Sequence, residues 1–210
     1  MLSKSLNWLA WTLLMFATLF FIFNNALHYF NLSSPVYAEN GIRPFRTIFM
    51  IHITGGVVAI LTGPWQFISA NRAKYTRIHR LTGKIYLTSI LISGLCALYL
   101  SVFHAILAQK AITFGLGLFF LAVAWLLTSS MAFWSIKKRN FEQHREWMIR
   151  SYVVTCGFTF FRVAFGVLGM AIKIDPGESL NISAWICWSV PLLITEFLLQ
   201  RKRISNGSSG

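Results

Sequence analysis

The sequence predicts an all-α integral membrane protein, a bundle of six transmembrane helices with both termini on the cytoplasmic side. Three observations predict this fold. Hydrophobic residues make up 56% of the 210 residues and charged residues only 12%, whereas soluble domains carry about 25% charged residues. Six apolar stretches are long enough to cross about 30 Å of hydrocarbon as helices. Basic residues gather in alternate connections between these stretches.

The apolar stretches give the expected spans at residues 7–30, 47–68, 84–104, 111–136, 147–172 and 183–200. Residues 1–203 are therefore expected to form one six-helix domain, followed by a disordered polar tail at 204–210. The first stretch follows Lys4, and residues 36–38 resemble a cleavage site, which would suit a signal peptide. The apolar run continues to about residue 30, so we favour a retained helix.

The distribution of basic residues sets the orientation, because cytoplasmic loops are enriched in Lys and Arg. With the N-terminus inside, the outer segments hold only Arg43, Arg46, Lys110 and Lys173. The inner segments hold Lys4, then Arg72, Lys74, Arg77, Arg80 and Lys84, then Lys137, Lys138, Arg139, Arg145 and Arg150, then Arg201, Lys202 and Arg203. We therefore expect a multi-pass protein of the bacterial inner (cytoplasmic) membrane. Its net charge of +13 then suits anionic inner-leaflet lipids rather than nucleic acid.

Two of the five histidines, His79 and His144, fall at the inner starts of the third and fifth expected spans. Two histidines at one depth on different helices can supply both axial nitrogens of a b-type haem. Nearby cations could bind the haem propionates, and these are Arg77, Arg80, Arg145 and Arg150. Gly83, one turn after His79, could let a porphyrin approach. Alternatively, the two His-Arg pairs are interfacial anchors that contact lipid phosphates.

Two further polar residues lie deeper in the expected spans. His52, about five residues inside the second span, could pair with His104 or His28 or bind a quinone head group. It could equally be a neutral histidine bonded to a neighbouring helix. Arg162 lies near the middle of the fifth span, where insertion of Arg costs about 2.5–3.5 kcal/mol. We expect it to face a cavity, an anionic ligand or carbonyl groups exposed by a kink.

Glu196 and Arg150 lie near the inner ends of the sixth and fifth expected spans. An ion pair between them is the structural interpretation, because pairing lowers the cost of burying either charge. The functional alternative is that Glu196 relays protons. The chain has no phosphate-binding glycine loop, GxSxG or HExxH motif, and the sequence leaves open whether the protein is an enzyme.

Four sequence blocks carry a family resemblance: HITGG at 52–56, GPWQF at 63–67, HRLTGKIY at 79–86 and HREWMIRSY at 144–152. Together they resemble a bacterial family of predicted membrane proteins catalogued as domain of unknown function 2306, over about His52 to Glu196. The resemblance implies a membrane-helix fold but no activity.

The chain is also distantly similar to six-helix transmembrane b-type cytochromes, such as the ascorbate-dependent ones. That similarity implies haem-ligand positions at His52, His79 and His144. The histidine expected on the fourth helix is missing. At most one of two haems therefore keeps both ligands, unless His104 substitutes.

Two functions follow as hypotheses. The first is a b-type haem or quinone-linked electron-transfer protein, in which His79 and His144 hold haem b. His52 and Arg162 would then form an outer site for a quinone or small electron donor. The second is a non-redox protein, either a small transporter or a membrane assembly or scaffold subunit. In that case Arg162 and Glu196 would mark a solute or proton path.

Overall fold

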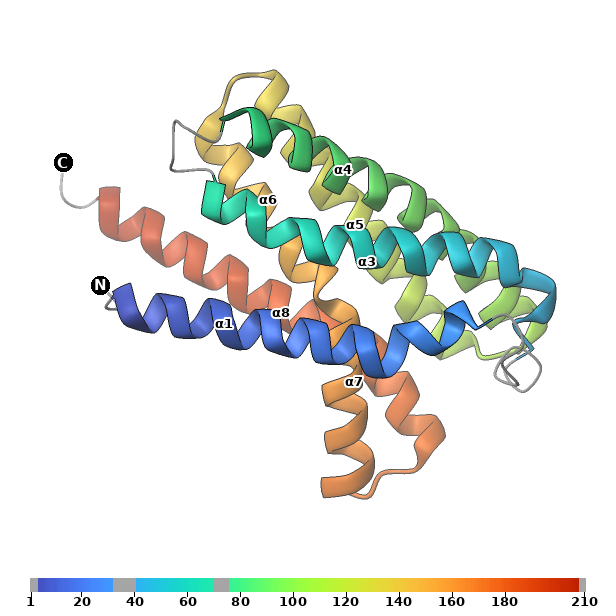
Figure 1. Cartoon of the computed structure of the whole chain (residues 1–210). Helices are drawn as coiled ribbons and strands as arrows, with labels where there is room; N and C mark the ends of the chain where they lie inside the picture. Colours follow the sequence, from blue (N-terminus) through green and yellow to red (C-terminus); the bar gives the residue numbers. More distant parts are fainter. Residues whose placement is uncertain (1–3, 32–40, 70–75, 208–210) are drawn as a thin grey trace.

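A computed structural model describes residues 4–31, 41–69 and 76–207, and all regular structure within these ranges is helical (Figure 1). Short π and 3-10 segments extend several of the helices. The helices, in order, are α1 (Lys4–Phe21), η1 (Ile22–Ala26), η2 (Leu27–Phe30), η3 (Arg43–Phe45), α3 (Arg46–Ser69), α4 (Thr76–Tyr99), η5 (Leu100–Ala108), α5 (Ile112–Lys137), α6 (Phe141–Thr155), α7 (Gly157–Gly166), η6 (Val167–Ala171) and α8 (Pro176–Gly207).

Within the described ranges, four helical stretches are long and apolar enough to cross a membrane: Arg43–Phe67, Thr76–Ala108, Ile112–Lys137 and Pro176–Ser205. The bent pair α6–α7 adds a fifth if it forms one span. The N-terminal helix contributes a shorter apolar segment, Met15–Asn24. The chain is therefore a helical membrane protein with four or five candidate spans. Six spans with both termini inside stay a prediction.

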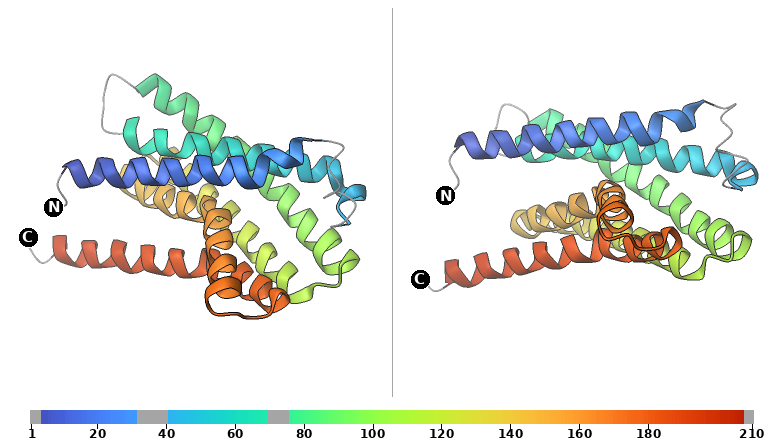
Figure 2. Two further views of the ribbon diagram at one scale, coloured as in Figure 1. Left: turned by 60° about the horizontal axis from the view of Figure 1, so that its bottom comes forward. Right: turned by 90° about the horizontal axis from the view of Figure 1, so that it is seen from below.

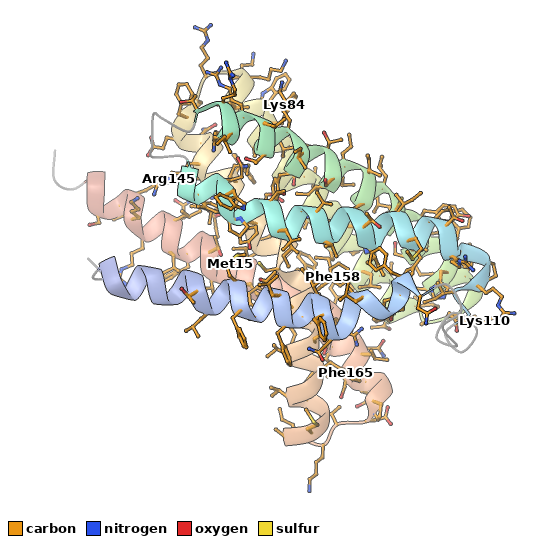
Figure 3. The ribbon with its side chains drawn as sticks, in the orientation of Figure 1. Met15, Lys84, Lys110, Arg145, Phe158 and Phe165 are labelled. Carbon is orange, nitrogen blue, oxygen red and sulfur yellow. The ribbon has the colours of Figure 1, made fainter. Side chains whose placement is uncertain are left out.

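The helix ends and several basic residues can be located along the bundle. Figures 1 and 2 show the N- and C-termini at the same end of the bundle. Lys84 and Arg145 lie towards this end, and Lys110 lies at the opposite end (Figure 3). Arg72 and Lys74, like the candidate cleavage site at 36–38, fall outside the described residues. The polar tail is helical as far as Gly207, where α8 ends.

Local sequence explains where several helices begin and end. The Asn140 side chain accepts a hydrogen bond from the Gln143 amide at 3.1 Å and caps α6. Asp175 accepts from the Gly177 amide at 2.8 Å ahead of α8, whose first residue is Pro176. Just after each of three other helical stretches lies a cation whose backbone is in the left-handed conformation. The φ angles are 53° at Lys110, 57° at Arg139 and 63° at Lys173. Cations at helix C-termini also offset the negative end of the helix dipole.

The bend between α6 and α7 measures 40° and centres on Cys156. It occurs without a proline. The Thr155 hydroxyl donates to the Ser151 carbonyl at 2.8 Å, and such bonding to the preceding turn bends helices. Gly157 follows directly. The two expected kink sites, Pro64 and Pro191, lie inside α3 and α8.

Glycines set how closely the helices approach one another. A Cβ atom at Gly63 on α3 would lie 2.2 Å from Cε2 of Tyr152 on α6, so the tyrosine ring occupies the place of a side chain. Gly55 is similarly backed by Ser93 on α4, at 2.8 Å from the Ser93 Cβ. The main core lies around Tyr86, Trp125 and Tyr152, which are 0%, 4% and 6% exposed.

We expect Gly63→Ala to lower the free energy of unfolding by about 1–3 kcal/mol, because the added methyl group must displace the Tyr152 ring. The matched control is Gly56→Ala on the same helix, where the nearest atom to an added Cβ is the Ser93 Oγ at 3.9 Å. Denaturant unfolding in detergent, followed by circular dichroism, measures both. Equal midpoints for the two variants would contradict the proposed close approach.

Candidate functional site

His144 lies in the first turns of α6, and its ring orientation is fixed by a backbone group. Its Nδ1 lies 2.8 Å from the carbonyl oxygen of Ala132 on α5. A carbonyl only accepts hydrogen bonds, so Nδ1 carries the proton and Nε2 carries the lone pair. No residue in the described ranges forms a hydrogen bond with that Nε2. Metal-ligating histidines are oriented in the same way, by a carbonyl on the opposite ring nitrogen.

The structure brings His79 and His144 to the same part of the bundle. The Tyr86 hydroxyl on α4 lies 2.9 Å from Ser151 Oγ on α6. His79 precedes Tyr86 by seven residues and His144 precedes Ser151 by seven, about two helical turns in each case. The two helices run in the same direction (Figure 1), so both histidines come two turns before this contact.

Two of the expected propionate-binding arginines lie beside these histidines in sequence. Arg80 is exposed and lines a groove on α4, together with Thr76, Arg77, Leu81 and Lys84. Arg145 is also exposed and lines a cavity between α6 and α8, together with Glu142, Glu146, Ile149, Leu199, Lys202 and Arg203. Solvent-facing cations are therefore present at the histidine end of the bundle.

Arg150, another of the expected propionate-binding arginines, has a different partner. Its Nε and Nη2 donate to Glu196 Oε2 at 2.8 and 2.6 Å, which confirms the ion pair expected from the sequence. Arg150 Nη1 lies 3.6 Å from Glu146 Oε2, and Arg203 pairs with Glu146 from α8. These contacts join α6 to α8 and leave Arg150 buried, so we do not assign it to propionate binding.

Gly83 also has a different role from the one expected. A Cβ atom there would meet the Gln66 Oε1 at 3.0 Å. The Gln66 side-chain amide donates to Thr82 Oγ1 at 2.7 Å. The missing side chain at Gly83 thus makes room for Gln66 of α3, and the suggestion that it admits a porphyrin is wrong.

A buried network of hydroxyl groups, which sequence reasoning missed, lies two turns from the histidine pair. Thr155 Oγ1 donates to the Ser151 carbonyl and accepts from Trp125 Nε1 at 2.8 Å. Tyr86 must then donate to Thr155 at 3.0 Å and accept from the Ser151 hydroxyl. Ser129 completes the chain by donating to Ser151 at 2.8 Å. Each hydroxyl donates once, so α4, α5 and α6 share one ordered network.

His52 is held between α3 and α4 at the end of the bundle away from the termini. Its Nδ1 lies 3.0 Å from the Ser93 carbonyl oxygen, and Ser93 Oγ donates to the His52 carbonyl at 2.7 Å. The residue is 9% exposed. Its ring makes a T-shaped contact with the Phe158 ring, with centroids 5.6 Å apart. The interpretation of His52 as a neutral histidine bonded to a neighbouring helix thus has direct support, yet it leaves the second ring nitrogen unexplained.

The proposed partners of His52 lie elsewhere. The His104 ring packs on Phe45 with centroids 5.4 Å apart, and His104 lies about three turns beyond Ser93 along the same helical stretch. The side chain of His28 lies outside the described part of the structure. Arg162 is exposed on α7, with its guanidinium carbon 5.9 Å from the Phe161 ring centroid. In the described ranges, no group of three or more His, Cys, Asp or Glu side chains could hold a metal ion.

Comparison with known proteins gives one match. The family model described as "Predicted membrane protein (DUF2306)" matches residues 49–199, and this region contains all four sequence blocks described above. No curated protein and no solved structure shows a significant match.

Proposed function

The chain belongs to the DUF2306 family of predicted membrane proteins, and within that family we propose that it is a b-type haem-binding electron-transfer protein of the bacterial inner membrane. We propose six spans with both termini inside, so that the histidine end of the bundle faces the cytoplasm. Arg77, Arg80 and Lys84 then lie at the anionic inner leaflet.

The observation that carries the proposal is the orientation of His144. The Ala132 carbonyl holds its Nδ1 proton and so leaves the Nε2 lone pair for iron. His79 reaches the same level from α4, as the matched spacing from the Tyr86–Ser151 contact indicates. These two histidines would hold the iron. Haem supplies one-electron chemistry when it is bound.

The charges at this end suit the acidic side of a haem. Arg80 and Arg145 directly follow the two histidines in sequence and are both exposed, so they are available to neutralise propionates. Only one such haem is proposed. A second haem is not proposed, because the His52 ring packs against Phe158 and the His104 ring packs against Phe45.

The alternative is a small transporter or a scaffold subunit. A proton-coupled transporter would use Glu196 as its carrier, but this carboxylate accepts two hydrogen bonds from Arg150 and one from Gln200. These contacts give Glu196 a structural role in an ion pair. The haem hypothesis is therefore preferred, because it also accounts for the orientation of His144.

An absorption spectrum of the full-length protein tests the proposal. We expect protein purified in detergent from haem-supplied cells to show a Soret band and, after dithionite reduction, sharp α and β bands. His144→Ala and His79→Ala should each abolish the six-coordinate spectrum, whereas His104→Ala should retain it. A featureless spectrum from folded, monodisperse wild-type protein would overturn the proposal.

A further inference from the structure

His52 has one ring nitrogen that the protein does not use. The Ser93 carbonyl accepts only a proton donor, so His52 Nδ1 carries the hydrogen and Nε2 carries a lone pair. Within the described ranges, no group donates a hydrogen bond to this Nε2. The residue is 9% exposed, and Nε2 keeps some accessible surface, because the buried side-chain atoms without a hydrogen-bond partner in the described residues are Thr159 Oγ1 and Ser183 Oγ. A ligand can therefore reach this nitrogen, and one that donates a hydrogen bond to it would be favoured.

The surroundings of this nitrogen determine what kind of ligand can reach it. Phe158, at the start of α7, presents its ring to His52 and is itself 36% exposed. Figure 3 shows Phe158 in the region between α1 and α3. The exposed flank of a membrane helix faces lipid, so a ligand would enter from the bilayer. It must therefore be apolar enough to dissolve there.

A second polar group lies close to the same place. Arg162 follows Phe158 by four residues, and residues at this spacing lie on the same face of a helix, about 5–6 Å apart. Arg162 is exposed, and within the described ranges it forms no ion pair. The guanidinium group only donates hydrogen bonds. The α7 face thus carries a hydrogen-bond donor one turn after Phe158, the residue whose ring contacts His52.

We propose that His52, Phe158 and Arg162 form a binding site for a quinol drawn from the bilayer. A quinol hydroxyl would donate to His52 Nε2, the aromatic head group would pack on Phe158, and Arg162 would donate to the second ring oxygen. Both oxygens of a quinol lie on one flat ring, which matches an acceptor and a donor on neighbouring surfaces. The inference rests on the proposed function for the choice of a redox-active quinol over other lipid-soluble phenols.

The decisive variant is His52→Asn. The asparagine amide nitrogen can take the place of Nδ1 and keep the bond to the Ser93 carbonyl, while the Nε2 position is lost. Ser93→Ala is the matched control, because it removes the hydroxyl but keeps the carbonyl that orients the ring. Decylubiquinol, kept reduced under nitrogen, is titrated into each protein in lipid nanodiscs, and binding is followed by tryptophan fluorescence quenching.

We expect saturable binding to the wild type, about tenfold or more weaker in His52→Asn and in Arg162→Gln, and little changed in Ser93→Ala. Unsaturable partitioning, or equal affinity in His52→Asn and wild type, would overturn the site. The same titration is carried out on haem-free protein, so the two proposals fail separately. Binding that depends on His52 without a haem spectrum would leave the site standing and overturn the haem. A normal haem spectrum without saturable quinol binding would support the haem and overturn the quinol site.

Discussion

Replacing Arg150 with methionine is expected to lower the free energy of unfolding by about 3 kcal/mol, the lower end of the range for breaking a buried ion pair. The Arg150 side chain is 9% exposed and the Glu146 side chain 11% exposed, but Glu196 is 41% exposed. Water can therefore rehydrate Glu196 when the guanidinium is removed, which limits the loss. The change also removes the contact of Arg150 with the Trp147 ring, 4.7 Å away, an interaction of about 0.5–1 kcal/mol at exposed sites.

Two further variants separate charge pairing from packing. Arg203→Met removes a cation from the same network, but its side chain is 47% exposed, so we expect a loss of about 0–1 kcal/mol. Replacing both Arg150 and Glu196 with apolar residues should recover much of the stability, because no unpaired charge remains. Denaturant unfolding in detergent measures all three. A loss for Arg203→Met as large as that for Arg150→Met would show that burial does not determine the effect.

The helices themselves could be predicted from the sequence because lipid imposes strong constraints on it. The apolar run at 111–136 predicts α5 to within a residue at each end. The Arg150–Glu196 pair was also predictable, since a charge inside an apolar span needs a partner. The start of α6 was placed six residues late, at 147 instead of Phe141. The apolar run begins only at 147, because residues 142–146 are mostly charged. The helix nevertheless begins earlier, where Asn140 caps it, and continues through these residues.

The site was less predictable because it depends on which helices become neighbours. Gly83 has the spacing expected of a residue that admits a porphyrin, yet it accommodates Gln66 from another helix. Serine and threonine within membrane spans can bond their own backbone, as Thr128 does to the Ala124 carbonyl at 2.7 Å. Only the packing of α4, α5 and α6 determines that Ser129 and Ser151 bond each other instead. The i, i+4 pairs Trp125/Ser129 and Ser151/Thr155 were the available signal.

The largest loss of stability is expected for Tyr86→Ala, about 3–5 kcal/mol, because a large side chain that is 0% exposed leaves a cavity. Tyr86→Phe separates the hydroxyl from the ring. It keeps the packing but leaves the Ser151 hydroxyl without its acceptor and removes one of the two donors to Thr155. Leaving buried polar groups unsatisfied costs about 1–3 kcal/mol.

Tyr99→Phe on the same helix is the control, because Tyr99 is 39% exposed and stacks on Phe103. We expect a change within about 0.5 kcal/mol for it. Unfolding midpoints should therefore fall in the order Tyr99→Phe, Tyr86→Phe, Tyr86→Ala. Tyr86 also fixes α4 against α6 two turns from His79 and His144, so haem occupancy should fall in the same order. Full occupancy in a strongly destabilised Tyr86→Ala protein would show that this contact does not position the two histidines.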